Sequence, residues 1–185
     1  MPDATPPDTP APSSHAAPRP RFRLEPLTAA HDVGDFSCGD DENARVIAEY
    51  LKTQALAEHT AGLNSVTVMV DVETGAVAGF FTLSPLSIPI SPAVLAALGL
   101  AGAPYRSVGG YLLGRLGVDA ALQGLGIGAA LATRALAQAR QGREDGLGGA
   151  FVAVDAKDER LVAWYTALGF QRLDPAKRRV VRSLR

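Results

Sequence analysis

The 185-residue sequence is poor in the residues that form disulfides and metal sites. Its single cysteine, Cys38, excludes an intramolecular disulfide. The three histidines, His15, His31 and His59, are scattered along the chain and give no spacing that suits a zinc site. We therefore expect no metal cofactor, and a reducing compartment such as the cytoplasm fits the lone thiol.

The sequence also lacks a recognisable targeting or membrane-spanning segment. Residues 1–20 hold seven of the thirteen prolines and have neither the basic start nor the apolar stretch of a signal peptide. This composition buries too little apolar surface to offset the entropy of ordering, so we expect a disordered segment over 1–20 and one domain over 21–185. The uncharged stretch Thr74–Tyr105 is cut by four prolines into pieces too short to span a bilayer. We expect a cytoplasmic protein with no membrane partner.

There is no excess of positive charge, since the net charge is −1. This balance argues against a protein that coats nucleic acid by bulk electrostatics. The charge is unevenly distributed, because residues 172–185 carry a net charge of +5 and the preceding 171 residues carry −6. Residues 172–185 either contact phosphate groups of a ligand or form a solvated terminal strand or tail, and the sequence leaves both interpretations open.

Hydrophobic periodicity predicts an α/β fold of the α+β type, with antiparallel strands first and a strand, loop, helix, strand, helix unit last. Strands are expected over Phe22–Leu27, Val66–Val70, Val77–Leu83, Gly109–Val118 and Ala150–Val154, and near Phe170 and Val180. Helices are expected over Asp41–His59, from the following glycine-rich turn to about Gln141, and over Asp158–Leu168. Thr28 is expected to cap a short helix at residues 29–31, and Ser84–Gly102 to interrupt the strand pattern.

Three alternating glycines, Gly124, Gly126 and Gly128, lie between a predicted strand and a predicted helix. Glycine lets the backbone approach a ligand closely, and the free amides and dipole at a helix start attract an anion, so we expect a phosphate-bearing cofactor. No lysine followed by serine or threonine completes a P-loop. The dinucleotide fingerprint is satisfied through Ala129, with Glu144 or Asp145 about 20 residues later, so an NAD site and a purely structural turn stay open as alternatives.

Two motifs together resemble the GNAT superfamily of N-acetyltransferases. Gln123-x-x-Gly126-x-Gly128 is similar to the pyrophosphate loop of that superfamily, and Tyr165, four residues before Gly169-Phe170, is similar to its closing motif. The resemblance implies a mixed, mostly antiparallel twisted sheet with flanking helices and a V-shaped splay between its two central strands. It also implies acetyl-CoA as the cosubstrate. The chain departs from the pattern at Asp158, where many members have an asparagine that contacts the cofactor.

The resemblance further implies roles for individual residues. Backbone groups of Leu116 and Val118 would pair with the pantetheine arm, and the Val118 amide would polarise the thioester carbonyl. The expected cofactor-binding residues are Leu116, Gly117, Val118, Gln123, Gly124, Leu125, Gly126, Ile127, Gly128, Ala129 and Asp158. Tyr165 is the expected general acid for the departing thiolate, because a phenol with a pKa near 10 can donate to it.

No general base stands out, and Asp119 and Asp155 at strand ends are only weak candidates. An α-amino group needs little help because its pKa of about 7.7 to 8.0 leaves it partly neutral at cellular pH. The absence of an obvious base therefore favours an α-amine acceptor over a lysine side chain.

From Phe22 to Arg185 the chain resembles the acetyltransferase toxins of bacterial toxin-antitoxin modules, through segments such as Phe36–Gly39, Gly79–Ser84 and Leu113–Gly128. The resemblance implies aminoacyl-tRNA as the acceptor, a small ribbon-helix-helix antitoxin as a partner, and a homodimer. The acidic residues 40–42 leave a polyamine-like or peptide amine open as the acceptor. A non-catalytic acyl-CoA-binding protein, and a thiol nucleophile at Cys38 assisted by His31 or His59, are further alternatives.

Overall fold

A computed structural model describes residues 21–100 and 106–185. The predicted disordered segment 1–20 lies outside the described residues, as does the end of the predicted interruption Ser84–Gly102. Within the two described ranges, no helix is long and apolar enough to cross a membrane.

The described strands form one seven-stranded sheet in the order β1-β2-β3-β4-β5-β7-β6. The strands are β1 Phe22–Pro26, β2 Ser65–Asp71, β3 Val77–Pro89, β4 Ser107–Val118, β5 Phe151–Asp155, β6 Gln171–Arg172 and β7 Arg179–Ser183. Among these strands, β4 and β5 are the one parallel pair, and all other neighbours are antiparallel. This topology confirms the mixed, mostly antiparallel sheet predicted from the sequence.

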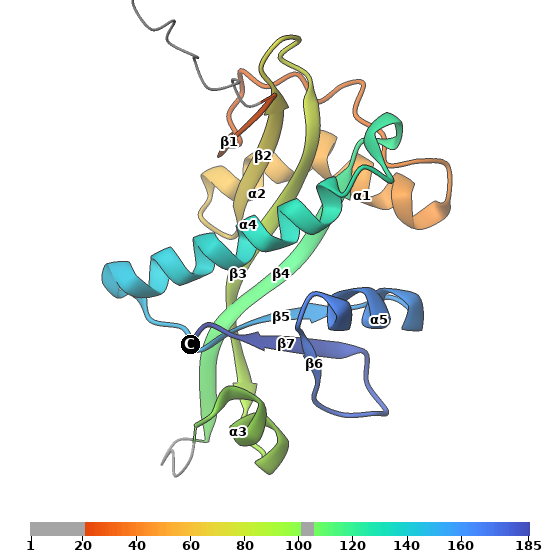
Figure 1. Cartoon of the computed structure of the whole chain (residues 1–185). Coiled ribbons are helices and arrows are strands. Elements are labelled where there is room, and N and C mark those ends of the chain that lie inside the picture. The colour runs from red at the N-terminus through yellow and green to blue at the C-terminus, as the bar shows by residue number, and fades with distance from the viewer. Residues whose placement is uncertain (1–20, 101–105) are drawn as a thin grey trace, which may run out of the picture.

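Helices cover both faces of the sheet (Figure 1). The helices are α1 Glu42–Thr53, α2 Ala55–Thr60, α3 Pro92–Leu98, α4 Ile127–Gly142 and α5 Glu159–Ala167. The buried residues of α4 and α5 share one core cluster that includes Val152 and Val154 of β5. Side chains alternate between faces along a strand, so Phe151 and Ala153, which pack with α3, lie on the opposite face. On that opposite face α1 and α2 pack on Val66, Val68 and Val70 of β2, while Met69 points to the α4 face.

The helix predicted after Thr28 is wrong, because residues 28–31 form a turn. The backbone N–H of Thr28 donates to Nδ1 of His31 over 2.9 Å, and the N–H of His31 donates to the Thr28 carbonyl over 3.2 Å. The other ring nitrogen of His31 lies 2.7 Å from a Glu25 carboxylate oxygen. Local side-chain bonds of this kind give the backbone an alternative to a helix.

The single helix predicted over Asp41–His59 is instead two helices that meet at Gln54, whose φ and ψ of −122° and −36° are not helical. The break allows the Tyr50 hydroxyl to donate to Glu58 over 2.8 Å, although eight residues of continuous helix would separate their Cα atoms by about 12 Å. Val46 is spaced four residues before the buried Tyr50, as on one helix face, yet it is 58% exposed.

The strand predicted to end at Leu83 continues through two prolines to Pro89 and pairs with β4 as far as Ser107. The N–H of Ile90 donates to the Arg106 carbonyl over 3.0 Å, so with a two-residue period the backbone of Pro89 and Pro85 faces away from β4. That edge has no partner among the described strands, because β2 pairs with β3 only as far as Leu83. Proline is tolerated where its missing N–H would face an open edge.

The central strands β4 and β5 touch at only one place. Tyr111 pairs with Val152 and Leu112 with Ala153, and the residues of β4 that follow, Leu113–Val118, have no partner on β5. The register between β3 and β4 shifts at the same point, since Phe81 faces Leu116 and Leu83 faces Leu113. One residue, Thr82, thus opposes Gly114 and Arg115, and the bulge bends β4 away from β5. This parting confirms the V-shaped splay.

Substitution of Gly110 by alanine is expected to lower the free energy of unfolding by about 1–3 kcal/mol. A Cβ at Gly110 would lie 2.6 Å from the Phe151 carbonyl oxygen and 2.7 Å from the Phe151 ring, where β4 and β5 make their contact. Urea unfolding measures the change. The matched control is Gly109→Ala, because a Cβ there would meet nothing within 4 Å. Equal stability of the two variants would contradict the close approach of the strands.

Candidate active site

The stretch of β4 beyond Leu112 has no strand partner on β5, on the side of the splay. The N–H of Asp119 donates to the Ala78 carbonyl on β3 over 3.0 Å. In an antiparallel pair the backbone groups alternate in direction, so those of Gly117 also face β3 while those of Leu116 and Val118 face away from it. Because β5 pairs with β4 only as far as Leu112, this edge of β4 is available to a ligand that forms hydrogen bonds as a neighbouring strand would.

The Val118 end of this edge is held by the segment around Cys38. The side-chain amide of Gln123 donates to the Cys38 carbonyl over 2.7 Å and to the Val118 carbonyl over 3.2 Å. The Gln123 side chain therefore links the backbone at Cys38 to the end of β4 at Val118. Burial raises the pKa of the Cys38 thiol to about 11, and the Val118 amide, which faces the sulfur, opposes that rise. A carbonyl oxygen bound at Val118 would compete with the thiol for this N–H.

The glycine-rich turn places the uncapped N-terminus of α4 beside the Val118 end of β4. Gly124 and Gly126 have φ values of 78° and 80°, in the left-handed region that favours glycine. α4 begins at Gly126 without a side-chain cap, so the amides of its first turn have no intrahelical partner. A Cβ at Gly128 would lie 3.6 Å from Trp164 and 3.8 Å from Val118, which places the helix start next to α5 and to the end of β4. Free amides at a positive dipole end suit a pyrophosphate.

Tyr165 lies on the face of α5 that contributes to the α4 core. Its ring is buried against Trp164 and Phe170, at centroid distances of 4.7 and 5.3 Å. Its hydroxyl has no hydrogen-bond partner among the described residues, and no described buried side-chain oxygen lacks a partner, so the hydroxyl is not sealed in the core. Burial raises the pKa of Tyr165 to about 12, which keeps the phenol protonated.

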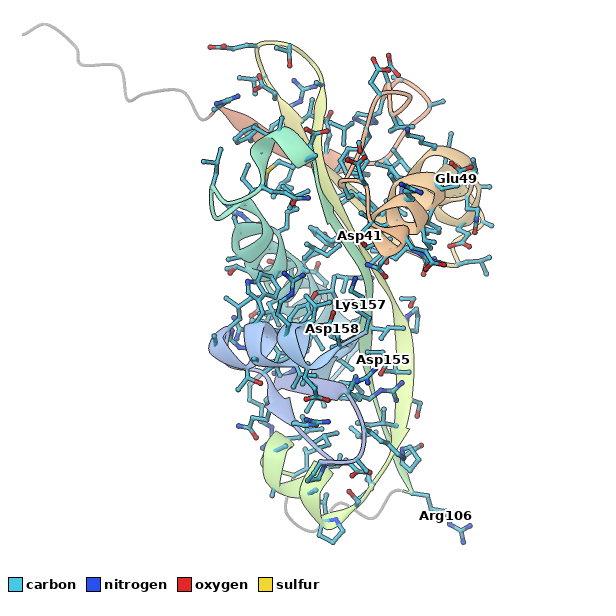
Figure 2. All side chains as sticks on the ribbon, turned by 90° about the vertical axis from the view of Figure 1, so that its right-hand side faces the viewer. Asp41, Glu49, Arg106, Asp155, Lys157 and Asp158 are labelled. Carbon is cyan, nitrogen blue, oxygen red and sulfur yellow. The ribbon has the colours of Figure 1, made fainter. Side chains whose placement is uncertain are left out.

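The helices α1 and α5 begin close together at the opening between the two halves of the sheet (Figure 2). Asp41 caps α1 by accepting from the Ala44 N–H over 3.0 Å, and Lys157 lies 3.8 Å from the Asp41 carboxylate. Asp158 caps α5 by accepting from the Leu161 N–H over 2.8 Å. The carboxylate of Asp158 thus has a structural role, and a cofactor contact from it stays a prediction.

Both aspartates considered as a base make hydrogen bonds within the chain, and only Asp155 is held in an ion pair. Asp119 accepts from the Ala121 N–H over 3.0 Å. Asp155 accepts two hydrogen bonds from Arg179, over 2.6 and 2.7 Å, and these lower the pKa of Asp155. A carboxylate held in this way is a poorer proton acceptor.

Most arginines of the basic C-terminal end make contacts within the chain. Arg172 pairs with Glu159 over 2.8 Å, and Arg178 lies 3.6 Å from the same carboxylate. Arg182 and Arg185 donate to the carbonyls of Leu168 and Gly99. These contacts favour the interpretation of this end as part of the fold over that of a free phosphate-binding surface.

Two alternatives from the sequence lose their support. Glu144 and Asp145 lie beyond the far end of α4, about 24 Å along the helix axis from the glycine turn, too far to bind the ribose of a dinucleotide held there. The Cys38 thiol is not activated, because His31 binds Glu25 and His59 accepts from the Val66 N–H over 3.2 Å. In the described part of the chain, no group of three or more His, Cys, Asp or Glu side chains could hold a metal ion.

Comparison with known proteins agrees with this geometry. The chain matches the acetyltransferase (GNAT) family over residues 39–170, which is most of its length. It therefore belongs to the GNAT acetyltransferase family. The match includes the free edge of β4, the glycine turn and Tyr165.

Solved structures with the same fold include toxins of toxin-antitoxin modules. One, AtaT complexed with acetyl-methionyl-tRNAfMet, is 24% identical with a TM-score of 0.76, covering 88% of this chain and 94% of that one. A tyrosine-to-phenylalanine variant of KacT is 22% identical with a TM-score of 0.77, covering 89% and 96%. A similar variant of the AtaT toxin, bound to the C-terminus of the antitoxin AtaR and to acetyl-CoA, is 21% identical with a TM-score of 0.72, covering 89% and 94%. At these identities the likeness shows the fold.

Sequence reasoning missed the residue that shapes the site. Thr82 is buried, and its hydroxyl accepts a hydrogen bond from the Arg115 N–H over 3.0 Å. It therefore satisfies a backbone group that the bulge removes from the ladder. No local signal marks Thr82, because the contact joins residues 33 apart in the sequence.

Thr82→Val is expected to lower the free energy of unfolding by about 1 kcal/mol, because the half-buried Arg115 N–H loses its acceptor. Thr82→Ser keeps the hydroxyl and is expected to be the more stable of the two variants. Urea unfolding of both variants measures the difference. A valine variant as stable as the serine variant would show that the hydrogen bond does not hold the bulge.

Proposed function

We propose that this acetyltransferase transfers the acetyl group of acetyl-CoA to a primary amine, and that the amine is the α-amino group of an aminoacyl-tRNA. The proposal rests on one observation above the others: the edge of β4 at Leu116 and Val118, which β5 does not pair with, ends beside the uncapped start of α4. A strand-like arm and a pyrophosphate group, which acetyl-CoA combines in one molecule, suit these two neighbouring features.

The residues present fit acetyl-CoA. Backbone groups of Leu116 and Val118 would pair with the pantetheine arm, and the amides of residues 124–129 would hold the pyrophosphate, with Gln123 keeping the Val118 end in place. When bound, acetyl-CoA supplies the acetyl group as a thioester. The Val118 N–H would stabilise negative charge on the thioester oxygen. Tyr165, protonated at neutral pH, would give its proton to the sulfur that leaves.

An α-amine is the acceptor that this site can use with least assistance. The described candidates for a general base, Asp119 and Asp155, are engaged in other contacts. An α-amino group with a pKa of about 7.7 to 8.0 is partly neutral at cellular pH, whereas a lysine amine with a pKa near 10.4 is not. The similarity to AtaT, solved with acetyl-methionyl-tRNAfMet, supports the α-amine of a charged tRNA.

The same similarities support a protein partner. AtaT is solved with the C-terminus of the antitoxin AtaR, so an antitoxin is the partner that we propose for this chain. A ribbon-helix-helix form of that antitoxin, and a homodimer of this chain, remain predictions from the sequence.

Release of CoA is expected when the wild-type protein, acetyl-CoA and charged tRNA are mixed, and Tyr165→Phe is expected to reduce kcat by roughly 10²- to 10⁴-fold. Because the Tyr165 hydroxyl has no hydrogen-bond partner among the described residues, the stability of the variant should change by less than about 0.5 kcal/mol. Calorimetry should give an unchanged Kd for acetyl-CoA. A thiol-release assay measures the rate.

The matched control is Tyr111→Phe, which removes the hydroxyl that donates to the Gly148 carbonyl over 2.9 Å and should keep the wild-type rate. A Tyr165→Phe variant as fast as wild type would contradict the role of the phenol as the acid. Release of CoA with polyamines or peptides but not with charged tRNA would replace the proposed acceptor by a small amine. Failure to bind acetyl-CoA would contradict the proposal as a whole.

A further inference from the structure

Arg115 is a cation that the proposed function does not use. It lies in the β4 bulge and is half-buried. Its guanidinium stacks over the ring of Tyr50, with 3.7 Å from Cζ to the ring centroid. No carboxylate among the described residues forms an ion pair with it. The donors of this guanidinium are therefore available to a ligand.

The guanidinium is also held in position from both sides. The Tyr50 ring is buried, and its hydroxyl donates to Glu58 over 2.8 Å and accepts from Asn64 over 3.3 Å. On the strand, the Arg115 N–H donates to the Thr82 hydroxyl, which fixes the backbone of the bulge. A planar fork of donors that is fixed in this way loses little conformational entropy when it binds an anion.

The position of Arg115 on the sheet separates it from the cofactor elements. Tyr165 and the buried side of α4 belong to the core on one face. Tyr50, on which Arg115 stacks, belongs to the core under α1 on the other face. The neighbouring residue Gly114 is exposed, so the strand is open to solvent beside Arg115. The glycine turn that would hold the cofactor lies on the α4 side, and Arg115 lies on the opposite side, which leaves that side to the acceptor amine.

We propose that Arg115 is a specificity-determining residue that binds a phosphate group of the acceptor. Arginine presents paired donors that match the oxygens of a phosphate, and a charge-assisted bond of this kind is among the stronger hydrogen bonds in proteins. Val118 lies three positions along the strand from Arg115, so their Cα atoms are roughly 10 Å apart, and we expect the phosphate and the acetyl group to be separated on that scale. The acceptor is thus a phosphate-bearing amine. This inference rests on the proposed acetyl transfer and names a feature of its acceptor.

The test compares two acceptors with the same α-amine that differ by one phosphate, puromycin and puromycin 5′-phosphate. For Arg115→Gln, we expect KM for the phosphate compound to rise about tenfold or more, while KM for puromycin and KM for acetyl-CoA stay at the wild-type values. Arg115→Lys keeps the positive charge but loses the paired donors of the guanidinium. Its KM for puromycin 5′-phosphate should therefore lie between those of wild type and Arg115→Gln. The matched control is Arg134→Gln, which removes an exposed charge from α4 and should change none of these constants.

Three results would overturn the proposal: an equal loss with both acceptors, an unchanged KM for the phosphate compound, or a raised KM for acetyl-CoA. If wild type acetylates neither compound, the proposed acceptor class fails, and calorimetric binding of puromycin 5′-phosphate still decides the role of Arg115. Binding to wild type that Arg115→Gln weakens tenfold supports the role. Equal binding by both proteins, or no binding to wild type, overturns it.

Discussion

The candidate site is built around the bulge in β4, where the Arg115 backbone amide donates to the hydroxyl of Thr82. The ladder between β4 and β5 ends at Leu112, and the bulge two residues later turns β4 away. A bulge leaves one residue outside the ladder, and a buried N–H without an acceptor costs about 1–3 kcal/mol. Thr82 supplies this acceptor, so β4 can separate from β5 while the Arg115 N–H keeps a hydrogen bond. The open edge at Leu116 and Val118 is the consequence.

The parting of the strands makes the two faces of the sheet different in chemistry. On the α4 face, the uncapped helix start, the glycine turn and Tyr165 supply free amides and a protonated phenol. On the α1 face, Arg115 supplies a cation stacked on Tyr50. The first set suits a pyrophosphate and a leaving thiolate, and the second suits an anionic acceptor. In acetyl transfer the amine nitrogen attacks the acetyl carbonyl carbon, so the two substrates must come into contact. The separation of β4 and β5 lies between the α4 face and the α1 face, where we propose that this contact is made.

Much of this arrangement could be predicted from the sequence. Most strands, the glycine turn and the two family motifs are local signals, because alternation and the spacing of glycines need no knowledge of the rest of the chain. The length of β3 was missed, because Pro85 reads as a strand breaker unless the open edge that it faces is known. The break at Gln54 was missed as well, since it depends on the contact of Tyr50 with Glu58. Thr82 and Arg115 are 33 residues apart, and their contact exists only once β3 and β4 have paired.

The central claim is that the free edge of β4 is where acetyl-CoA pairs. Amide hydrogen exchange, measured residue by residue by NMR with and without acetyl-CoA, tests this most directly. In the free protein the Leu116 amide should exchange faster than that of Gly117, which faces β3. Saturating acetyl-CoA should protect the Leu116 amide and the amides of Ile127 and Gly128 together. Protection of the helix amides with no change at Leu116 would contradict the claim, and so would binding that changes neither.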